Sequence, residues 1–321
     1  EISACLVGSE MCIRDRYNRG GDRMKIYDTH SDIMFNLYNR TMNGEKDVFA
    51  KYHLDDLKKG GIAGGIWVIY SETDFDIQQA YDSAIHAFKP YEKEFDVLYG
   101  LEGLRNVKNI DELNVLYQKG IRHASLTWNE ENHFATGVGG ASDHGLKEDG
   151  KEIIKYMNHH HMIIDVSHLN IKSFYDVLNE NPKILMASHS NAFTLSNHRR
   201  NLNDDQLKAL KELNGYVGVN SARNFVSYEK TKQNLNGLVD HIIYLGNYLG
   251  IDHIMLGLDM MHFLSDYNNA NLDDLSSHKD ASNIEKILIQ RGFSKDEIEL
   301  ICYKNYLNAI SLVERRKEKE I

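Results

Sequence analysis

The sequence predicts an α/β fold, a closed (β/α)8 barrel of the TIM type with a helical extension at its C-terminal end. From Met24 onward, eight short β-rich runs alternate with stretches of helical pattern. Strands that alternate with helices pair in parallel through right-handed crossovers, and eight repeats favour a closed barrel over an open sheet. The expected strands are residues 25–28, 62–70, 97–101, 124–128, 162–166, 184–188, 216–219 and 254–258.

The segments between these runs carry helix signals. Residues 111–117 repeat apolar side chains at helical spacing, and the pattern stops at Gly120. Residues 203–206 indicate an N-terminal cap before a leucine stripe that Gly215 ends. These patterns predict helices between the third and fourth strands and between the sixth and seventh.

A helical tail follows the eighth strand. The acidic, Asn-rich residues 265–283 indicate a loop, and residues 294–297 form a capping box. Ile298, Ile301 and Leu307 then repeat as an apolar stripe. No linker interrupts the chain, so we expect residues 24–321 to form one domain.

Residues 1–23 do not share the pattern of the rest. They lack an amphipathic period and have no basic segment followed by a long apolar core, so they make a poor signal peptide. Met24 precedes the first strand as a native start would. We therefore expect residues 1–23 to be a non-native leader.

Composition narrows the class of protein. With 321 residues, 42% hydrophobic and 26% charged, the chain can bury a large core. Its net charge of −10 argues against a nucleic-acid partner, which requires a basic face. Three cysteines without paired or metal-binding spacing favour a reducing, cytoplasmic location. No apolar run approaches the roughly 18 to 20 residues that span a bilayer, so we expect no membrane insertion.

Polar residues recur where the expected strands end, which is where barrels of this type carry their chemistry. His30 and Asp32 follow the first strand one residue apart, and alternation along a strand would place them on one face. Imidazole and carboxylate are the usual protein ligands of zinc and similar ions. Three histidines and three carboxylates at one barrel mouth suit two metals that share a carboxylate. The six residues are His30, Asp32, Glu102, His168, His189 and Asp259.

On these residues the chain resembles the membrane dipeptidase (renal dipeptidase) family of amidohydrolase-like, metal-dependent hydrolases. The similarity extends from Met24 to about Ile310 and so covers nearly all of the chain that we assign to the fold. The matching segments are residues 28–32, 101–103, 165–168, 188–190, 199–201, 240–242 and 250–259.

The resemblance implies two Zn²⁺ or other divalent ions per chain. By analogy with the family, His30, Asp32 and Glu102 would bind the first ion. Glu102 would bridge to the second ion, which His168 and His189 would bind.

The resemblance also implies roles in catalysis. Asp259 would be the acid/base residue, acting beside the bridging Glu102. Arg200 would bind the substrate carboxylate, and its planar guanidinium suits the terminal carboxylate that every free dipeptide carries.

Two departures from the family pattern affect the expected substrate range. Relatives carry a substrate-binding His after the fourth strand, and Trp128 stands at that place here. Asn129, Asn132 or His133 could supply the missing hydrogen bond. Met260 and Met261 replace a frequent Phe-Asp pair, which would make the rim near the second metal more apolar.

The main hypothesis is a cytoplasmic, binuclear metal-dependent dipeptidase that hydrolyses free dipeptides with a metal-bridging hydroxide. One rival is an amidohydrolase-type hydrolase of another small amide or lactam. Another is a barrel that binds metal without catalysis, although such a protein would not need Asp259. The sequence leaves open the preferred side chains, the metal, and whether the chain forms a homodimer.

Overall fold

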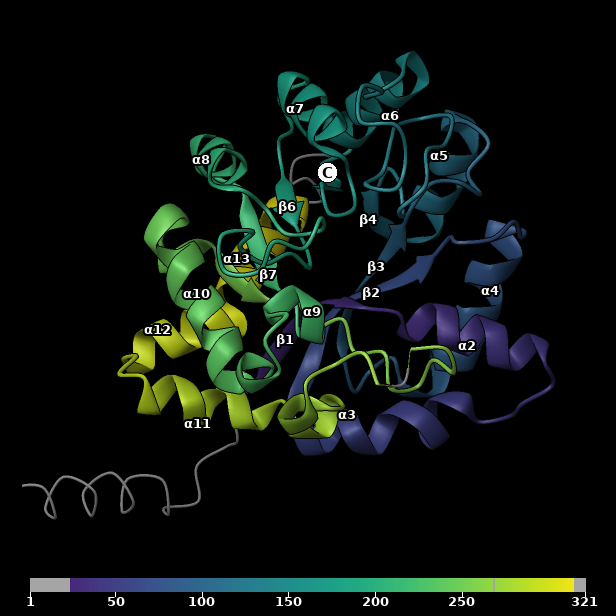
Figure 1. The fold of residues 1–321 in the computed structure, drawn as a ribbon. Helices are drawn as coiled ribbons and strands as arrows, with labels where there is room; N and C mark the ends of the chain where they lie inside the picture. The colour runs from purple at the N-terminus through teal and green to yellow at the C-terminus, as the bar shows by residue number, and fades with distance from the viewer. Residues whose placement is uncertain (1–23, 268, 315–321) are drawn as a thin grey trace, which may run out of the picture.

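A computed structural model describes residues 24–267 and 269–314 as a closed barrel of eight parallel strands. Each strand pairs with the next along the chain, and the eighth pairs with the first, which closes the barrel (Figure 1). The predicted fold class is therefore confirmed. The strands are β1 (Ile26–Ser31), β2 (Ile62–Tyr70), β3 (Asp96–Glu102), β4 (Ile121–Ser125), β5 (Ile163–Asp165), β6 (Leu185–Ala187), β7 (Tyr216–Val219) and β8 (Ile254–Leu256).

Helices surround the barrel on its outer side (Figure 1). The expected caps are present, because Gly120 ends α5 with φ +121° and Asn203 forms a capping box with Gln206 at the start of α8. The helices are α2 (Ile33–Met42), α3 (Asp55–Gly60), α4 (Ile77–Phe88), α5 (Ile110–Lys119), α6 (Glu148–His159), α7 (Ile171–Asn179), α8 (Asp204–Glu212), α9 (Arg223–Val226), α10 (Leu235–Leu249), α11 (Ser282–Gln290), α12 (Lys295–Glu299) and α13 (Asn305–Glu314).

The expected strands all form, and the largest difference is in β4. This strand begins at Ile121, directly after the glycine that ends α5, and it finishes at Ser125. The predicted range, residues 124–128, thus starts and ends three residues too late, and it leaves out Arg122 and His123. His123 is in fact fully buried, and its Nε2 atom lies 3.1 Å from Asp165 Oδ2.

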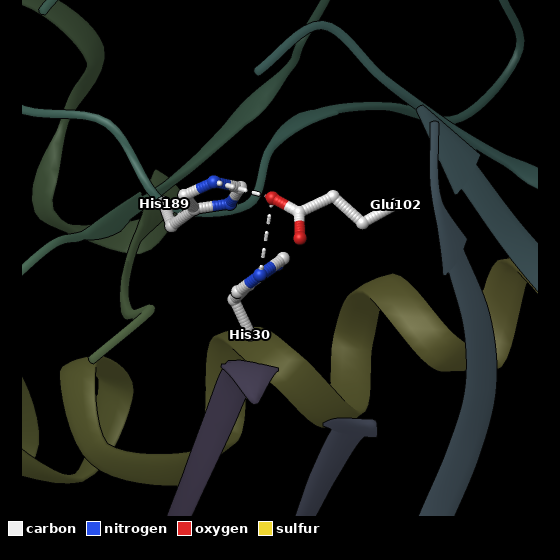
Figure 2. Close-up of side chains that lie close together, drawn as sticks. All are labelled: His30, Glu102 and His189. Atoms are coloured by element: carbon white, nitrogen blue, oxygen red, sulfur yellow. Dashed lines mark ion pairs between the residues drawn. The ribbon is translucent and has the colours of Figure 1, made fainter. Parts of the chain in front are cut away.

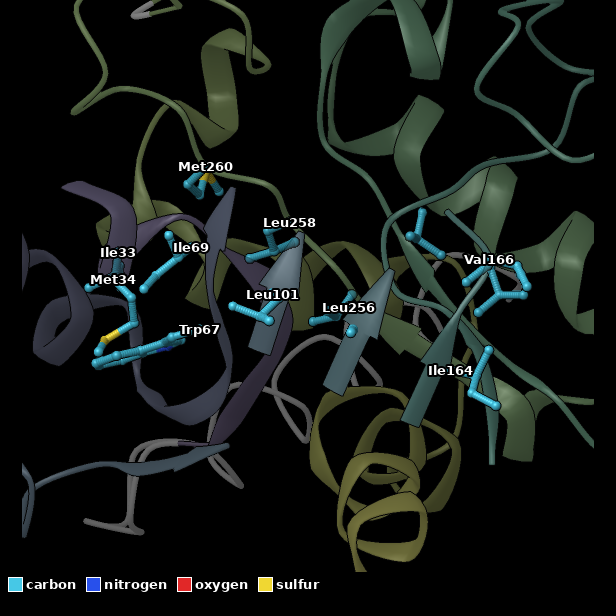
Figure 3. Packing of buried hydrophobic residues seen from close by; sticks show 14 of the residues in the cluster. Ile33, Met34, Trp67, Ile69, Leu101, Ile164, Val166, Leu256, Leu258 and Met260 are labelled. Carbon is cyan, nitrogen blue, oxygen red and sulfur yellow. The ribbon is translucent and has the colours of Figure 1, made fainter. Parts of the chain in front are cut away.

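The core has two layers that follow the alternation of side chains along the strands. In β2, Ile66 and Val68 belong to the apolar cluster that includes Tyr306 of α13. Trp67 belongs to the larger cluster shared with the surrounding helices, and Figure 3 shows it beside Met34 of α2. Both faces of the strand are therefore buried, as in other all-parallel barrels.

The C-terminal helices extend the barrel, and one predicted contact in them is wrong. Ile301 is buried as expected, but Leu307 is 40% exposed. A π-helical turn at Leu300–Lys304 adds a residue to the helical path, so the buried face continues through Tyr306 instead. The Tyr306 ring stacks on Tyr27 of β1 with a centroid separation of 4.6 Å, which places α13 near the start of that strand.

The proposed leader, residues 1–23, lies outside the described residues, as do Cys5 and Cys12. The expected loop at 265–283 contains two short 3-10 turns, η5 (Asp273–Leu275) and η6 (His278–Asp280), and α11 begins at its end. Within residues 24–267 and 269–314, no helix is both long and apolar enough to cross a bilayer.

Candidate metal centre and active site

The barrel brings the predicted polar residues together where its strands end. His30 and Glu102 lie at the ends of β1 and β3, whereas His168 and His189 lie in the loops after β5 and β6. Figure 2 shows His30, Glu102 and His189 pointing toward one another from three different parts of the barrel. All four side chains are buried.

One carboxylate oxygen, Glu102 Oε1, is the centre of this cluster. It lies 2.6 Å from His168 Nε2, 3.3 Å from His189 Nε2 and 3.5 Å from His30 Nε2. The Nε2 atoms of His168 and His189 are 2.9 Å apart. Donor atoms of His30, Asp32 and Asp259 also lie within 4.8 Å of one another, so a second group of candidate ligands adjoins the first.

His30 and Asp32 do come together, but not through simple strand alternation. The pairing of β1 with β2 jumps from Asp28–Gly65 to Ser31–Trp67, which leaves one extra residue in β1. Bulges of this kind re-aim side chains near active sites. Asp32 stands just beyond the strand at the N-cap position of α2, with its Oδ1 atom 4.0 Å from His30 Nε2.

Two residues of the site adopt a backbone conformation that L-amino acids rarely take. His168 has φ +70° and Asp259 has φ +51°. Such conformations cost free energy, of the order of 1 kcal/mol or more, and persist only where surrounding structure holds them. The segments that follow β5 and β8 thus hold His168 and Asp259 in the backbone conformations that direct their side chains to the cluster.

The hydrogen bonds of the imidazoles show that the cluster suits a cation. His168 Nδ1 lies 3.0 Å from Asn129 Oδ1, an acceptor, so Nδ1 carries the proton and Nε2 presents a lone pair. His189 Nδ1 lies 2.7 Å from the Ser188 hydroxyl, which donates its own proton to Asp165. Two lone pairs therefore face each other and the Glu102 carboxylate, an arrangement that a divalent metal would satisfy.

Unpartnered atoms and charges agree with this fit. His30 Nε2 and Asp32 Oδ1 are buried and have no hydrogen-bond partner among the described residues. Burial opposes a charge on His30, but Glu102 raises its pKa to about 10. Burial likewise opposes ionisation of Glu102, but His30 and His168 hold its pKa well below the usual value. Burial, together with Glu102, raises the pKa of Asp32. Charged groups and unpartnered nitrogen and oxygen atoms are thus crowded together in the buried centre, as residues that bind a cation would be.

Asp259 lies beside the cluster and faces a cavity. Asn220, at the end of β7, donates a 2.9 Å hydrogen bond from Nδ2 to Asp259 Oδ2. Burial, assisted by the charge of Glu102, raises the pKa of Asp259. A carboxylate with a raised pKa and a fixed orientation can accept a proton and return it.

Arg200 borders the same cavity, whose volume is about 390 Å³. Its Nη2 atom donates a 2.7 Å hydrogen bond to His189 Nε2, and its guanidinium lies 5.6 Å from the centroid of the Phe225 ring. Burial lowers the pKa of Arg200 to about 10, so the group still carries its charge at neutral pH. A buried cation beside the cluster can bind an anionic part of a ligand.

Of the residues proposed for substrate contact after the fourth strand, some line the cavity and others do not. Trp128 and Asn129 line the cavity, although the Asn129 side chain also binds His168. His133 is not among the lining residues: its Nε2 atom bonds the carbonyl of Val107 and its ring packs on Phe134. His133 is exposed and makes these contacts apart from the cavity lining, and its role in substrate binding stays a prediction.

The sequence analysis did not identify the residues that orient the site residues through hydrogen bonds. Ser188 contacts His189 and Asn220 contacts Asp259, whereas Asp165 acts through Ser188, and none of the three belongs to the predicted set. Ser188 and Asp165 stand within matched motifs, and Asn220 directly follows a strand, so strand-end position was the available signal.

Comparison with known proteins gives one family. A model described as membrane dipeptidase (peptidase family M19) matches residues 72–320. The dipeptidase tcpJ of Claviceps purpurea (strain 20.1) is 26% identical over 289 residues, which cover 88% of this chain and 66% of that relative. An uncharacterized protein in the pqqA 5' region of Klebsiella pneumoniae is 32% identical over 212 residues, or 63% of this chain and 76% of its own length.

A solved structure shows the same fold. It is the crystal structure of a metallo peptidase from Rhodobacter sphaeroides liganded with a phosphinate mimic of the dipeptide L-Ala-D-Ala. The TM-score is 0.76 at 21% sequence identity, and the alignment covers 92% of this chain and 99% of the other.

Proposed function

Because the chain belongs to the membrane dipeptidase family of metallopeptidases, we propose that it is a binuclear metal-dependent dipeptidase. The observation that carries this proposal is the convergence of three imidazole Nε2 atoms on one carboxylate oxygen, Glu102 Oε1. A carboxylate among several imidazoles can be shared by two adjacent divalent ions.

The proposed ligands fall into two groups joined by one residue. His30, Asp32 and Glu102 would hold one ion, and Glu102, His168 and His189 would hold the other. Zinc suits this set of nitrogen and oxygen donors. When bound, a pair of such ions polarises a carbonyl group and lowers the pKa of a water molecule between them.

The remaining residues of the site would handle the substrate. Asp259, held by Asn220, would take a proton from the attacking water and pass it to the leaving amine. Arg200 would bind the terminal carboxylate of the dipeptide in a bidentate manner, which fixes the scissile carbonyl near the cluster. The cavity of about 390 Å³ gives room for a small substrate.

Substrate length and charge test this proposal. The experiment compares one dipeptide, its C-terminal amide and the matching tripeptide, in zinc and in chelator. We expect the free dipeptide to be hydrolysed best. The amide lacks the carboxylate, and the tripeptide either places its carboxylate two residues beyond the scissile bond or adds a residue on the amino side that the cavity must accommodate. Chelator should abolish the activity, and elemental analysis should find close to two divalent ions per chain.

Arg200→Ala sharpens the test. Loss of a charge-assisted bidentate contact costs about 1.5 to 3 kcal/mol, so kcat/KM for the dipeptide should fall roughly ten- to a hundredfold. Arg200→Lys keeps the charge but not the planar fork, and it should recover only part of the loss. The amide should respond little to either change. Equal hydrolysis of acid and amide by the unaltered protein would instead favour the amidohydrolase-type rival.

A further inference from the structure

One serine hydroxyl touches histidines of both proposed metal groups. Ser188 Oγ lies 2.7 Å from His189 Nδ1 and 3.3 Å from His30 Nδ1. The two rings are themselves close, with centroids 3.6 Å apart. In each imidazole, the nitrogen that faces Ser188 is the one directed away from Glu102.

The hydrogen-bonding capacity of this hydroxyl is fully used. Ser188 Oγ donates its single proton to Asp165 Oδ2 at 2.5 Å. A hydroxyl then has two lone pairs left, which can accept one N–H from His30 and one from His189. In its neutral form each imidazole is thereby held as the tautomer that presents Nε2 without a proton to the cluster.

Asp165 is itself held as an acceptor. Its Oδ1 atom accepts hydrogen bonds from the backbone N–H groups of Ser167 and Ser188, at 2.9 and 3.1 Å. Its Oδ2 atom lies 3.1 Å from Nε2 of the buried His123. A carboxylate with this many donors cannot rotate freely, so the Ser188 proton has one direction to point.

The backbone of Ser188 is fixed as well. Its carbonyl oxygen accepts a 2.8 Å hydrogen bond from the Thr29 hydroxyl. Side chains at Gly218 or Gly257 would collide with that oxygen, because a Cβ atom at either position would lie within about 2 Å of it. Strand β7 and the residue directly after β8 therefore leave room only for glycine beside Ser188.

We propose that Ser188, anchored by Asp165, is a positioning residue shared by the two metal groups, so that one hydroxyl sets the orientation of a ligand in each. This inference rests on the proposed binuclear function and adds to it a physical link between the sites. Outer partners of metal-binding histidines typically change metal affinity ten- to a hundredfold when they are removed. A shared partner should do so at both sites together.

The chain offers two matched comparisons. Ser190 flanks His189 on its other side and is equally buried, but its hydroxyl has no hydrogen-bond partner among residues 24–267 and 269–314. Asn129 bonds Nδ1 of His168 and so serves only the second group. Ser188→Ala thus removes a partner that both metal groups share. Asn129→Ala removes a partner of the second group alone, and Ser190→Ala removes no partner of either group.

The experiment titrates zinc into metal-free protein by calorimetry with a competing chelator. Ser188→Ala should raise both dissociation constants by about tenfold or more, whereas Asn129→Ala should raise one and Ser190→Ala neither. A change in only one constant for Ser188→Ala, or an equal effect of Ser190→Ala, would overturn the inference. If Ser188→Ala does not fold, Ser188→Cys provides the same comparison with a weaker acceptor.

A second measurement separates this inference from the proposed function. In protein labelled with ¹⁵N-histidine, the Nδ1–H signals of His30 and His189 should both shift in Ser188→Ala while that of His168 stays. Asn129→Ala should give the opposite pattern. If the unaltered protein binds only one zinc ion, the binuclear function is contradicted. The Nδ1–H signals would still show whether Ser188 contacts both rings. A shift of only one of the two signals in Ser188→Ala would refute the shared role.

Discussion

At the scale of single residues, Asp259 is held from two sides. Its carboxylate accepts a hydrogen bond from Asn220, and its backbone carbonyl accepts one of 2.9 Å from the side chain of Asn271. These contacts stabilise a left-handed backbone conformation that aspartate seldom adopts. The side chain is therefore oriented before any substrate binds.

Asp259→Asn should separate proton transfer from metal binding. The amide keeps the shape and can still contact Asn220, but it cannot accept and return a proton. We expect turnover to fall by about 10² to 10⁴-fold, with metal content and unfolding temperature retained. Steady-state kinetics beside elemental analysis measure both. Hydrolysis at the unaltered rate would show that the proton shuttle lies elsewhere.

The sequence predicts the candidate metal ligands, but it does not predict the residues that hold them through hydrogen bonds. His30, Glu102 and His189 could be predicted because histidine and glutamate at strand ends are unusual without a role. Ser188 and Asn220 are ordinary residues whose importance depends on which neighbour a hydrogen bond reaches. Ser188 is next to His189 in the chain, but its other partners, Asp165 and His30, are 23 and 158 residues away, and Asn220 is 39 residues from Asp259, so no local pattern indicates these contacts.

At the scale of elements, the loop between β6 and α8 carries Arg200 and is tied to α10. His241 of α10 accepts a 3.1 Å hydrogen bond at Nδ1 from the backbone N–H of Ala192 in that loop. Its Nε2 atom donates a 2.9 Å bond to the carbonyl of Val226 in α9. Three segments thus meet at one neutral, fully buried imidazole.

This contact predicts a loss of stability in acid. Burial lowers the pKa of His241 to about 4, below its ordinary value of about 6.5 in an unfolded chain. Between these values the unfolded state binds the proton more readily, so stability is full above about pH 6.5 and falls as the pH drops toward 4. The contribution is roughly 3 kcal/mol.

Urea denaturation at several pH values measures this effect. His241→Gln cannot titrate, so it should lose less stability than the unaltered chain between pH 6.5 and 4.5. Other buried histidines are present in both proteins, and their contributions cancel in the comparison. Parallel pH profiles for the two proteins would rule out His241 as a source of the acid sensitivity.

Local sequence signals fixed some element boundaries better than others. The cap at Asn203 and the stop at Gly120 were predictable because both act through nearby backbone groups. The π-helical turn at Leu300–Lys304 was not, since packing against the barrel rather than a local signal selects it. Leu307 was consequently assigned to the wrong face.

At the scale of the whole molecule, the candidate centre exists only when the barrel closes. Its residues come from β1, β3 and the segments after β5, β6 and β8, and no two of these are joined by a short turn. Burial, with Glu102 and Asp259 nearby, raises the pKa of Asp32, so these three carboxylates repel one another, and a bound metal ion would reduce this cost of folding. Metal binding and closure of the barrel should therefore be coupled.

This coupling predicts that metal removal destabilises the entire chain. A ligand that binds only the folded state adds about 4 kcal/mol when it is present at a thousand times its dissociation constant. Differential scanning calorimetry in zinc and in chelator should then show unfolding temperatures several degrees apart. Glu102→Gln is the control: it removes the charge shared by both proposed groups, so its unfolding temperature should respond less to zinc. Equal unfolding temperatures for the unaltered protein in zinc and chelator would mean that the cluster closes without metal, and that His30 and its partners balance the three carboxylates alone.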